Sequence, residues 1–134
     1  MIEDAIRFTL RDMLGIHESQ HYFDTTITHH ANSAIMVLDQ LGVPLKPGFT
    51  LYSDDQFWED LLVDPSQFHA VKTYIYLYVR LMFDPPTASL LTALKEQLKE
   101  LEWRLNVQAE TLHLKNSVRT NVFDEYRQNG SFEG

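Results

Sequence analysis

Cysteine is absent from the 134 residues of this chain. Disulfide bonds and zinc sites built from thiolates are therefore excluded, and the composition gives no support to a secreted protein. Runs of 18 apolar residues are also missing, so we expect no helix that spans a membrane. The first four residues, Met-Ile-Glu-Asp, carry acids where a signal peptide would carry positive charge, so we expect no export signal.

Basic residues are scarce as well. The chain has 11 Lys and Arg against 19 Asp and Glu, which gives a formal net charge of -8. A protein that binds nucleic acid over a broad surface needs many cations against the phosphates, so this charge argues against that function. The hydrophobic fraction of 44% is ordinary for a globular chain, and the length suits one domain.

Glycine, proline and capping residues divide the chain into segments with helical periodicity. We predict an all-α domain over residues 1–109, a small bundle of four to five helices, followed by a polar tail over residues 110–134. The tail is expected to be partly disordered or to become ordered on assembly. The expected helices cover about residues 2–14, 24–41, 54–62, 65–83 and 87–109, with a Pro/Gly loop between the second and the third.

Several local signals fix the boundaries of these helices. Asp24 and Asp64 are expected N-caps, and Pro65 suits a first helical position because its missing N–H would be unpaired there anyway. Ser53 to Gln56 reads as a capping box. Residues 50–52 and 111–114 are candidates for short strands.

Two apolar stripes predict how the last two helices pack. The fourth helix looks central, because its tyrosines broaden its apolar surface. Its stripe is Phe68, Val71, Ile75, Tyr78, Val79 and Met82. The fifth helix carries a narrow leucine seam at spacings of three and four, as in coiled coils: Leu91, Leu94, Leu98, Leu101 and Leu105.

Residues 17–21 read HESQH, the His-Glu-x-x-His pattern of zinc proteases. That chemistry needs both histidines on one helix face, with the glutamate polarising the bound water. Here Gly15 precedes the motif and the expected cap Asp24 follows it, so the motif falls in a connector, and the extended pattern lacks its third histidine. A zinc hydrolase using His17, Glu18 and His21 stays as an alternative function. A milder role is a subunit contact sensitive to pH between about 6 and 7.

A longer stretch is more specific. Residues 71–87, VKTYIYLYVRLMFDPPT, and residues 101–107, LEWRLNV, resemble the head-tail connector (adaptor) family of tailed phages and prophages, in its lambda-like siphophage form. The likeness covers about residues 2–110. The positions that carry it are Lys72, Tyr74, Arg80, Asp84, Pro85, Pro86, Trp103 and Arg104. A salt bridge or a helix C-cap is the simple structural reading of Arg80 and Asp84.

The resemblance implies a structural subunit with no catalytic residue, cofactor or metal. Such subunits form a ring, typically of twelve copies, below the portal protein, where they extend the DNA channel and receive the tail terminator or head-closure protein. Duplex DNA would pass without sequence-specific binding, which suits an acidic chain. The expected location is the head-tail junction of the virion, and the host bacterial cytoplasm during assembly. A helical adaptor unconnected with virions is a further alternative.

Two segments are candidates for partner contacts, because loops and termini can reorder on assembly. One is the loop of Lys46, Pro47, Gly48 and Phe49, for which an ordinary exposed loop is the alternative. The other is the tail, with Phe123 and Tyr126 as its candidate contacts.

Overall fold

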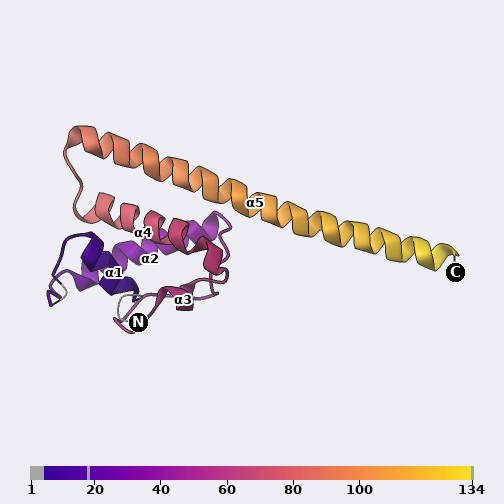
Figure 1. Cartoon of the computed structure of the whole chain (residues 1–134), viewed down its shortest axis with the longest axis horizontal. Coiled ribbons are helices and arrows are strands. Elements are labelled where there is room, and N and C mark those ends of the chain that lie inside the picture. Colours follow the sequence, from indigo (N-terminus) through magenta and orange to yellow (C-terminus); the bar gives the residue numbers. More distant parts are fainter. Residues whose placement is uncertain (1–4, 18, 134) are drawn as a thin grey trace.

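The fold is all-α, as the sequence predicts. The structure, a computed structural model, describes residues 5–17 and 19–133; beyond residue 112, Leu114 is the one side chain described. Figure 1 shows a helical body from which one long helix extends. The elements are α1 (Ile6–Met13), α2 (Asp24–Gln40), α3 (Trp58–Leu61), the 3-10 turn η2 (Pro65–Gln67), α4 (Phe68–Phe83) and α5 (Ala88–Glu133).

Helix α4 is central, as its apolar surface predicts. It packs against α2 on one side and α5 on the other, an order visible in Figure 1. Its buried residues are Val71, Tyr74, Ile75, Leu77 and Val79. Met82, the last residue of the predicted stripe, lies in the final turn of the helix and is 49% exposed.

The leucine seam joins α5 to this body. Leu94, Leu98 and Leu105 are buried and belong to the same core cluster as α2 and α4. Burying a leucine side chain stabilises the fold by roughly 1.5–3 kcal/mol. The seam therefore fixes the first half of α5 to the body.

Asp64 caps as predicted, because its Oδ1 accepts a hydrogen bond from the backbone N–H of Ser66 at 3.0 Å. It opens the short turn η2, which leads into α4. The prediction for Asp24 is wrong in detail. Asp24 is the first residue of α2 and not its N-cap, because its carboxylate accepts hydrogen bonds from side chains of the preceding segment.

The Ser53–Gln56 segment forms half of its predicted capping box. Gln56 Oε1 accepts from the Ser53 N–H at 3.0 Å and from the Tyr52 N–H at 2.6 Å. The helix nevertheless begins later, at Trp58. Asp60 Oδ2 accepts from the Phe57 N–H at 2.9 Å there, so a carboxylate one turn after Gln56 provides the cap.

The predicted strand over residues 50–52 is wrong. The Leu51 backbone is instead paired with one side chain of α2: Asn32 Nδ2 donates to the Leu51 carbonyl at 3.0 Å, and the Leu51 N–H donates to Asn32 Oδ1 at 2.8 Å. Within residues 5–17 and 19–133, extended pairing is limited to isolated bridges between Ala5 and Phe57 and between Leu45 and Leu62.

Helix α5 continues through the predicted tail. It spans 46 residues, or about 69 Å at 1.5 Å per residue, where the sequence predicts roughly 34 Å. The strand expected over residues 111–114 is therefore wrong. The division of the chain at residue 110, and an effect of assembly on the tail, stay predictions.

Candidate functional site

The HESQH segment lies in the loop between α1 and α2, as predicted. Gly15, with φ of +78°, turns the chain out of α1. The ring nitrogen Nδ1 of His17 lies 2.7 Å from Ser19 Oγ, and that of His21 lies 2.9 Å from Asp24 Oδ2. Glu18 lies outside the described residues. The two histidines thus share no helix face, and each is hydrogen-bonded to a different partner.

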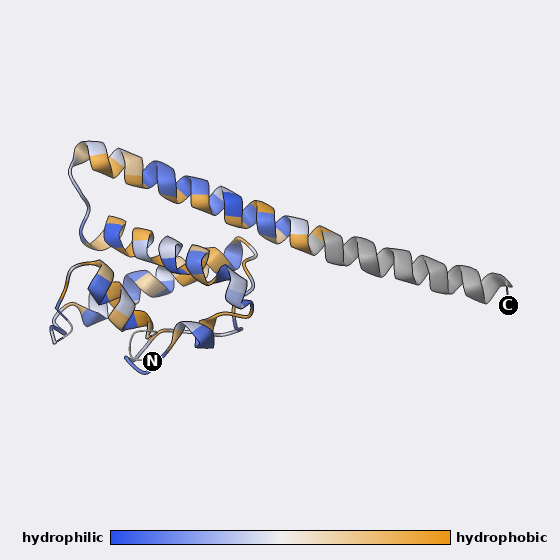
Figure 2. Cartoon of the chain, in the orientation of Figure 1, coloured by the Kyte–Doolittle hydropathy of each residue, from blue (hydrophilic) through white to orange (hydrophobic). Residues whose placement is uncertain are grey.

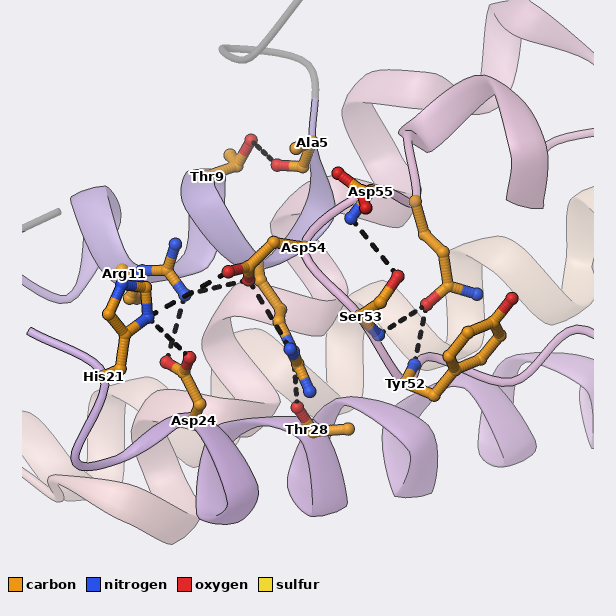
Figure 3. A network of polar contacts seen from close by, with 12 residues as sticks. Ala5, Thr9, Arg11, His21, Asp24, Thr28, Tyr52, Ser53, Asp54 and Asp55 are labelled. Atoms are coloured by element: carbon orange, nitrogen blue, oxygen red, sulfur yellow. Dashed lines mark hydrogen bonds and ion pairs between the residues drawn. The ribbon is translucent and has the colours of Figure 1, made fainter. Parts of the chain in front are cut away.

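A buried arginine is the centre of the polar cluster beside this loop (Figure 3). Arg11 is on α1 and only 4% exposed. Its Nη1 donates to Asp24 Oδ1 at 3.0 Å and to Asp54 Oδ1 at 3.1 Å. One guanidinium therefore connects α1, the start of α2 and the turn before α3.

Two further side chains complete this cluster. Arg7 Nε donates to Thr28 Oγ1 on α2 at 2.9 Å, and its Nη1 lies 3.5 Å from Asp54 Oδ1. Partial burial acts to raise the pKa of Asp54. The hydrogen bond from Arg11 and the charges of both arginines outweigh that effect and hold the pKa below its usual value. Asp54 is therefore ionised at neutral pH, and the cluster is balanced in charge.

The cluster could also be read as a metal site. The ligand atoms of His21, Asp24 and Asp54 lie within 4.8 Å of one another. However, Arg11 already bonds one oxygen of each carboxylate and offsets their charge, so a cation would compete with a buried guanidinium. The geometry favours a structural brace between three segments over a metal centre.

The 46–49 loop, which is predicted to contact partners, forms a turn at Gly48. Lys46, Pro47 and Gly48 are exposed, and Phe49 is half-buried against the core. Gly48 has φ of +72°, and the Lys46 N–H donates to the Leu61 carbonyl at 2.8 Å.

This loop borders a depression of about 290 Å³ that α2 completes. Met36 of α2 lines the depression and is 57% exposed. The loop is thus one wall of a concave surface, and its role in binding a partner stays a prediction.

Some residues that carry the family resemblance hold the fold. Tyr74 is 1% exposed. Burial, the nearby Glu102 carboxylate and a hydrogen bond to it raise the pKa of Tyr74, so its hydroxyl stays protonated. The Tyr74 hydroxyl on α4 thus lies near the Glu102 carboxylate on α5. The ammonium group of Lys72 lies 4.9 Å from the centre of the Phe68 ring, a cation–π contact.

At the end of α4, Asp84 acts as a C-cap, since its N–H donates to the Arg80 carbonyl at 2.9 Å. Arg80 itself donates to Tyr76 Oη at 3.1 Å. Of the two simple readings for Arg80 and Asp84, the C-cap is the one formed. Pro85 and Pro86 follow, where the chain turns toward α5.

The remaining candidates lie on α5. Trp103 is 65% exposed and so contributes little to the core. Arg104 pairs with Glu100, four residues before it on the helix, at 2.6 Å. Phe123 and Tyr126 fall on the helix, but their side chains lie outside the described part of the structure.

Sequence reasoning missed Arg11 and Asn32. Both are polar residues whose partners lie far away in the chain, and no local motif marks them. The one available signal was the position of Arg11 beside Leu10, on the face of α1 that buries Ile6 and Leu10.

Comparison with known proteins gives one family. The model of a family described as phage connector protein matches residues 8–111. The match includes Arg11, Asp24 and Asp54, the 46–49 loop and the leucine seam. No curated protein matches the chain, and no solved structure does. Among the described residues, no helix has the length and apolar character needed to cross a membrane.

Proposed function

Because the chain belongs to the phage connector protein family, we propose that it is a structural subunit of the head-tail connector ring, in its lambda-like siphophage form. The match over residues 8–111 carries the proposal. The family is one of structural proteins, so its members are virion components. In the proposed assembly, the ring lies below the portal protein, extends the DNA channel and joins the capsid to the tail.

The charge of the chain supports a channel role. A net charge of -8 disfavours condensation of the subunit onto phosphates. Duplex DNA in a channel lined by such subunits would slide without sequence-specific contacts. A ring of about twelve copies would repeat this charge around the passage.

Two surfaces are proposed for the neighbours of the ring. The 46–49 loop and the depression beside it would contact the portal or the tail terminator, since an exposed loop next to a concave, partly apolar surface can bind a protruding side chain. The C-terminal half of α5, with Phe123 and Tyr126, would contact the partner on the other side. Virion assembly would take place in the host bacterial cytoplasm.

No observation favours the zinc hydrolase. Its two histidines lie in a loop, each hydrogen-bonded to another side chain. A metal analysis of the purified protein, together with an activity screen of the Glu18→Gln variant, tests this alternative. Stoichiometric zinc and an activity lost in the variant would overturn the structural proposal.

The proposal itself is tested by assembly. The purified chain is mixed with the portal protein of the same phage and imaged by electron microscopy. We expect a ring bound to the portal, with the symmetry of the portal. A monomeric free chain is compatible with the proposal, whereas failure to form any complex at high concentration with a folded portal would contradict it. A Lys46→Glu, Phe49→Ala variant tests the loop, with the exposed Thr26→Ala as its control.

A further inference from the structure

Helix α5 has a second apolar stripe that the fold leaves uncovered. Trp103 is 65% exposed, Val107 38% and Leu114 61%. Trp103 follows the buried Leu94 by nine residues, or two and a half turns, so it lies on the opposite face of the helix. Val107 and Leu114 follow it at four and eleven residues, which returns them to nearly the same direction. These three residues are the outer stripe.

An apolar pocket lies on another part of the molecule. It is a hollow of about 230 Å³ lined by Trp58, Glu59, Leu62, Pro65 and Phe68, between α3, η2 and the first turn of α4. Trp58 is almost fully buried and packs edge-on against the Phe68 ring at 5.9 Å between centroids. The pocket is thus rigid and aromatic, and it is open to solvent.

The two surfaces cannot meet within one chain. Figure 1 shows α3 on the side of the body opposite α5. Trp103 lies on the face of α5 opposite the leucine seam, whereas Leu114 also borders a hollow beside Gln40, Leu41 and Gly42 of the body. Figure 2 shows hydrophobic and hydrophilic colour alternating along the first half of α5. Exposed apolar patches of this kind mark interaction sites more often than isolated exposed residues do.

One charge beside each surface is complementary to the other. Arg104 is adjacent to Trp103, and its side chain is 67% exposed. Glu59 is exposed and lines the pocket. Each side also carries the opposite sign, since Glu100 pairs with Arg104 and the ammonium of Lys72 lies over the Phe68 ring. A chain that places Trp103 in the pocket of another copy could therefore pair Arg104 with Glu59.

We propose that the outer stripe of one subunit docks in the pocket of a second copy of this chain, with Trp103 as the anchor and Arg104 opposite Glu59. Tryptophan and arginine are the residues most enriched at the energetic centres of interfaces. A contact between two different surfaces of the same chain is heterologous, and it closes into a ring when the rotation between copies permits. The inference rests on the proposed function for its biological setting, but not for its geometry.

The absence of cysteine allows a direct test of this contact. A chain carrying both Glu59→Cys and Arg104→Cys is oxidised, free at high concentration and also bound to the portal, and then run on a non-reducing gel. We expect a ladder of covalent multimers. Mixing the two single variants should give a dimer that contains one of each. A Glu59→Cys, Asp12→Cys chain is the matched control, because Asp12 is also exposed but lies on α1.

A second variant measures the anchor. Trp103→Ala should keep its helical circular dichroism and weaken self-association by roughly 30-fold or more, as truncation of an interface anchor does. Arg104→Glu should weaken it less, and adding Glu59→Arg should restore part of the loss. Such rescue would not follow from a purely structural role.

The outcomes separate the two proposals. If a portal complex forms but the 59–104 pair crosslinks no more than the 12–59 control, the interface is wrong and the connector function stands. Disulfides between two copies of Arg104→Cys alone would overturn the interface in favour of a symmetric pairing of α5. If the ladder forms in the free chain but no portal complex does, the interface stands and the proposed function is wrong.

Discussion

Replacing Arg11 with methionine tests whether the buried polar cluster holds the N-terminal half of the fold together. Methionine replaces the aliphatic stem of arginine with an unbranched apolar side chain and removes the guanidinium. Arg11 is 4% exposed, and its Nη1 bonds Asp24 at 3.0 Å and Asp54 at 3.1 Å. The substitution therefore leaves two carboxylates without their shared partner.

The size of the effect follows from the exposure of those carboxylates. Removing one partner of a fully buried ion pair costs about 3–5 kcal/mol. Asp24 is 17% exposed and carries most of that penalty, whereas Asp54 is 44% exposed and can be hydrated. Arg11 Nε has no hydrogen-bond partner among the described residues, so its removal relieves a small cost. We expect a net loss of about 2–3 kcal/mol, or a Tm lower by about 10 °C.

The measurement is thermal and urea unfolding followed by circular dichroism. Arg104→Met is the matched control: its ion pair with Glu100 is short, at 2.6 Å, but both side chains are more than half exposed. Such a pair contributes less than about 0.5 kcal/mol. Combining Arg11→Met with Asp54→Asn should cost less than the sum of the two single changes. If Arg11→Met is no less stable than Arg104→Met, the reasoning about the cluster is wrong.

Three further predictions concern other parts of the fold. Asn32→Ala leaves the N–H and carbonyl of the buried Leu51 unpaired and should lower the free energy of unfolding by about 2–4 kcal/mol in urea titration; an unchanged midpoint would contradict it. Gly42→Ala should lower Tm more than Gly48→Ala, because both have positive φ but only at Gly42 would a Cβ lie close to a neighbour, 3.3 Å from Ala109 Cβ; equal losses would refute the steric part. Burial, and then the neighbouring His29, lower the pKa of His30 in the folded state. The neutral form of His30 therefore contributes stability above about pH 6.5, and that contribution is lost as pH falls through the lower folded pKa. His30→Gln should make the free energy of unfolding less dependent on pH between about pH 7 and 5, and an unchanged slope would argue against this.

Local signals predicted much of the fold. The leucine seam of α5 and the Asp64 cap were readable because helical spacing and capping chemistry involve residues a few positions apart. Local signals at Gly15 and Asp24, on either side of HESQH, likewise predicted that this motif lies in a connector. Arg11 and Asn32 were missed because their partners lie far along the chain: Asp54 is 43 residues from Arg11, and Leu51 is 19 from Asn32.

The extent of α5 was missed for a related reason. A helix carries an apolar stripe where it packs against another element. The contact of α5 with the body ends near Ala109, which faces Gly42. Beyond that point no neighbouring element of the described chain imposes a stripe, so the helix leaves no periodic signature. The error at Asp24 arose from competition: Arg11 and His21 hydrogen-bond the carboxylate that was expected to cap the helix.

The resemblance to phage connectors, carried by residues 71–87 and 101–107, is confirmed by the family match. The individual candidate contacts are not tested by it. Trp103 illustrates why: sequence likeness marks the position, but only its exposure distinguishes a surface anchor from a core residue such as Tyr74.

The length of α5 beyond the body determines both how far its end lies from the body and which way the side chains there point. Each residue removed from a continuous helix shortens it by about 1.5 Å and also turns everything beyond the cut by about 100°. In a flexible tail such a deletion would have little effect on direction. In a helix held at one end by the leucine seam, it changes the direction in which the far end presents its side chains. Deletions or insertions of about seven or eleven residues nearly preserve that direction. This part of the chain can therefore vary in length only in such steps.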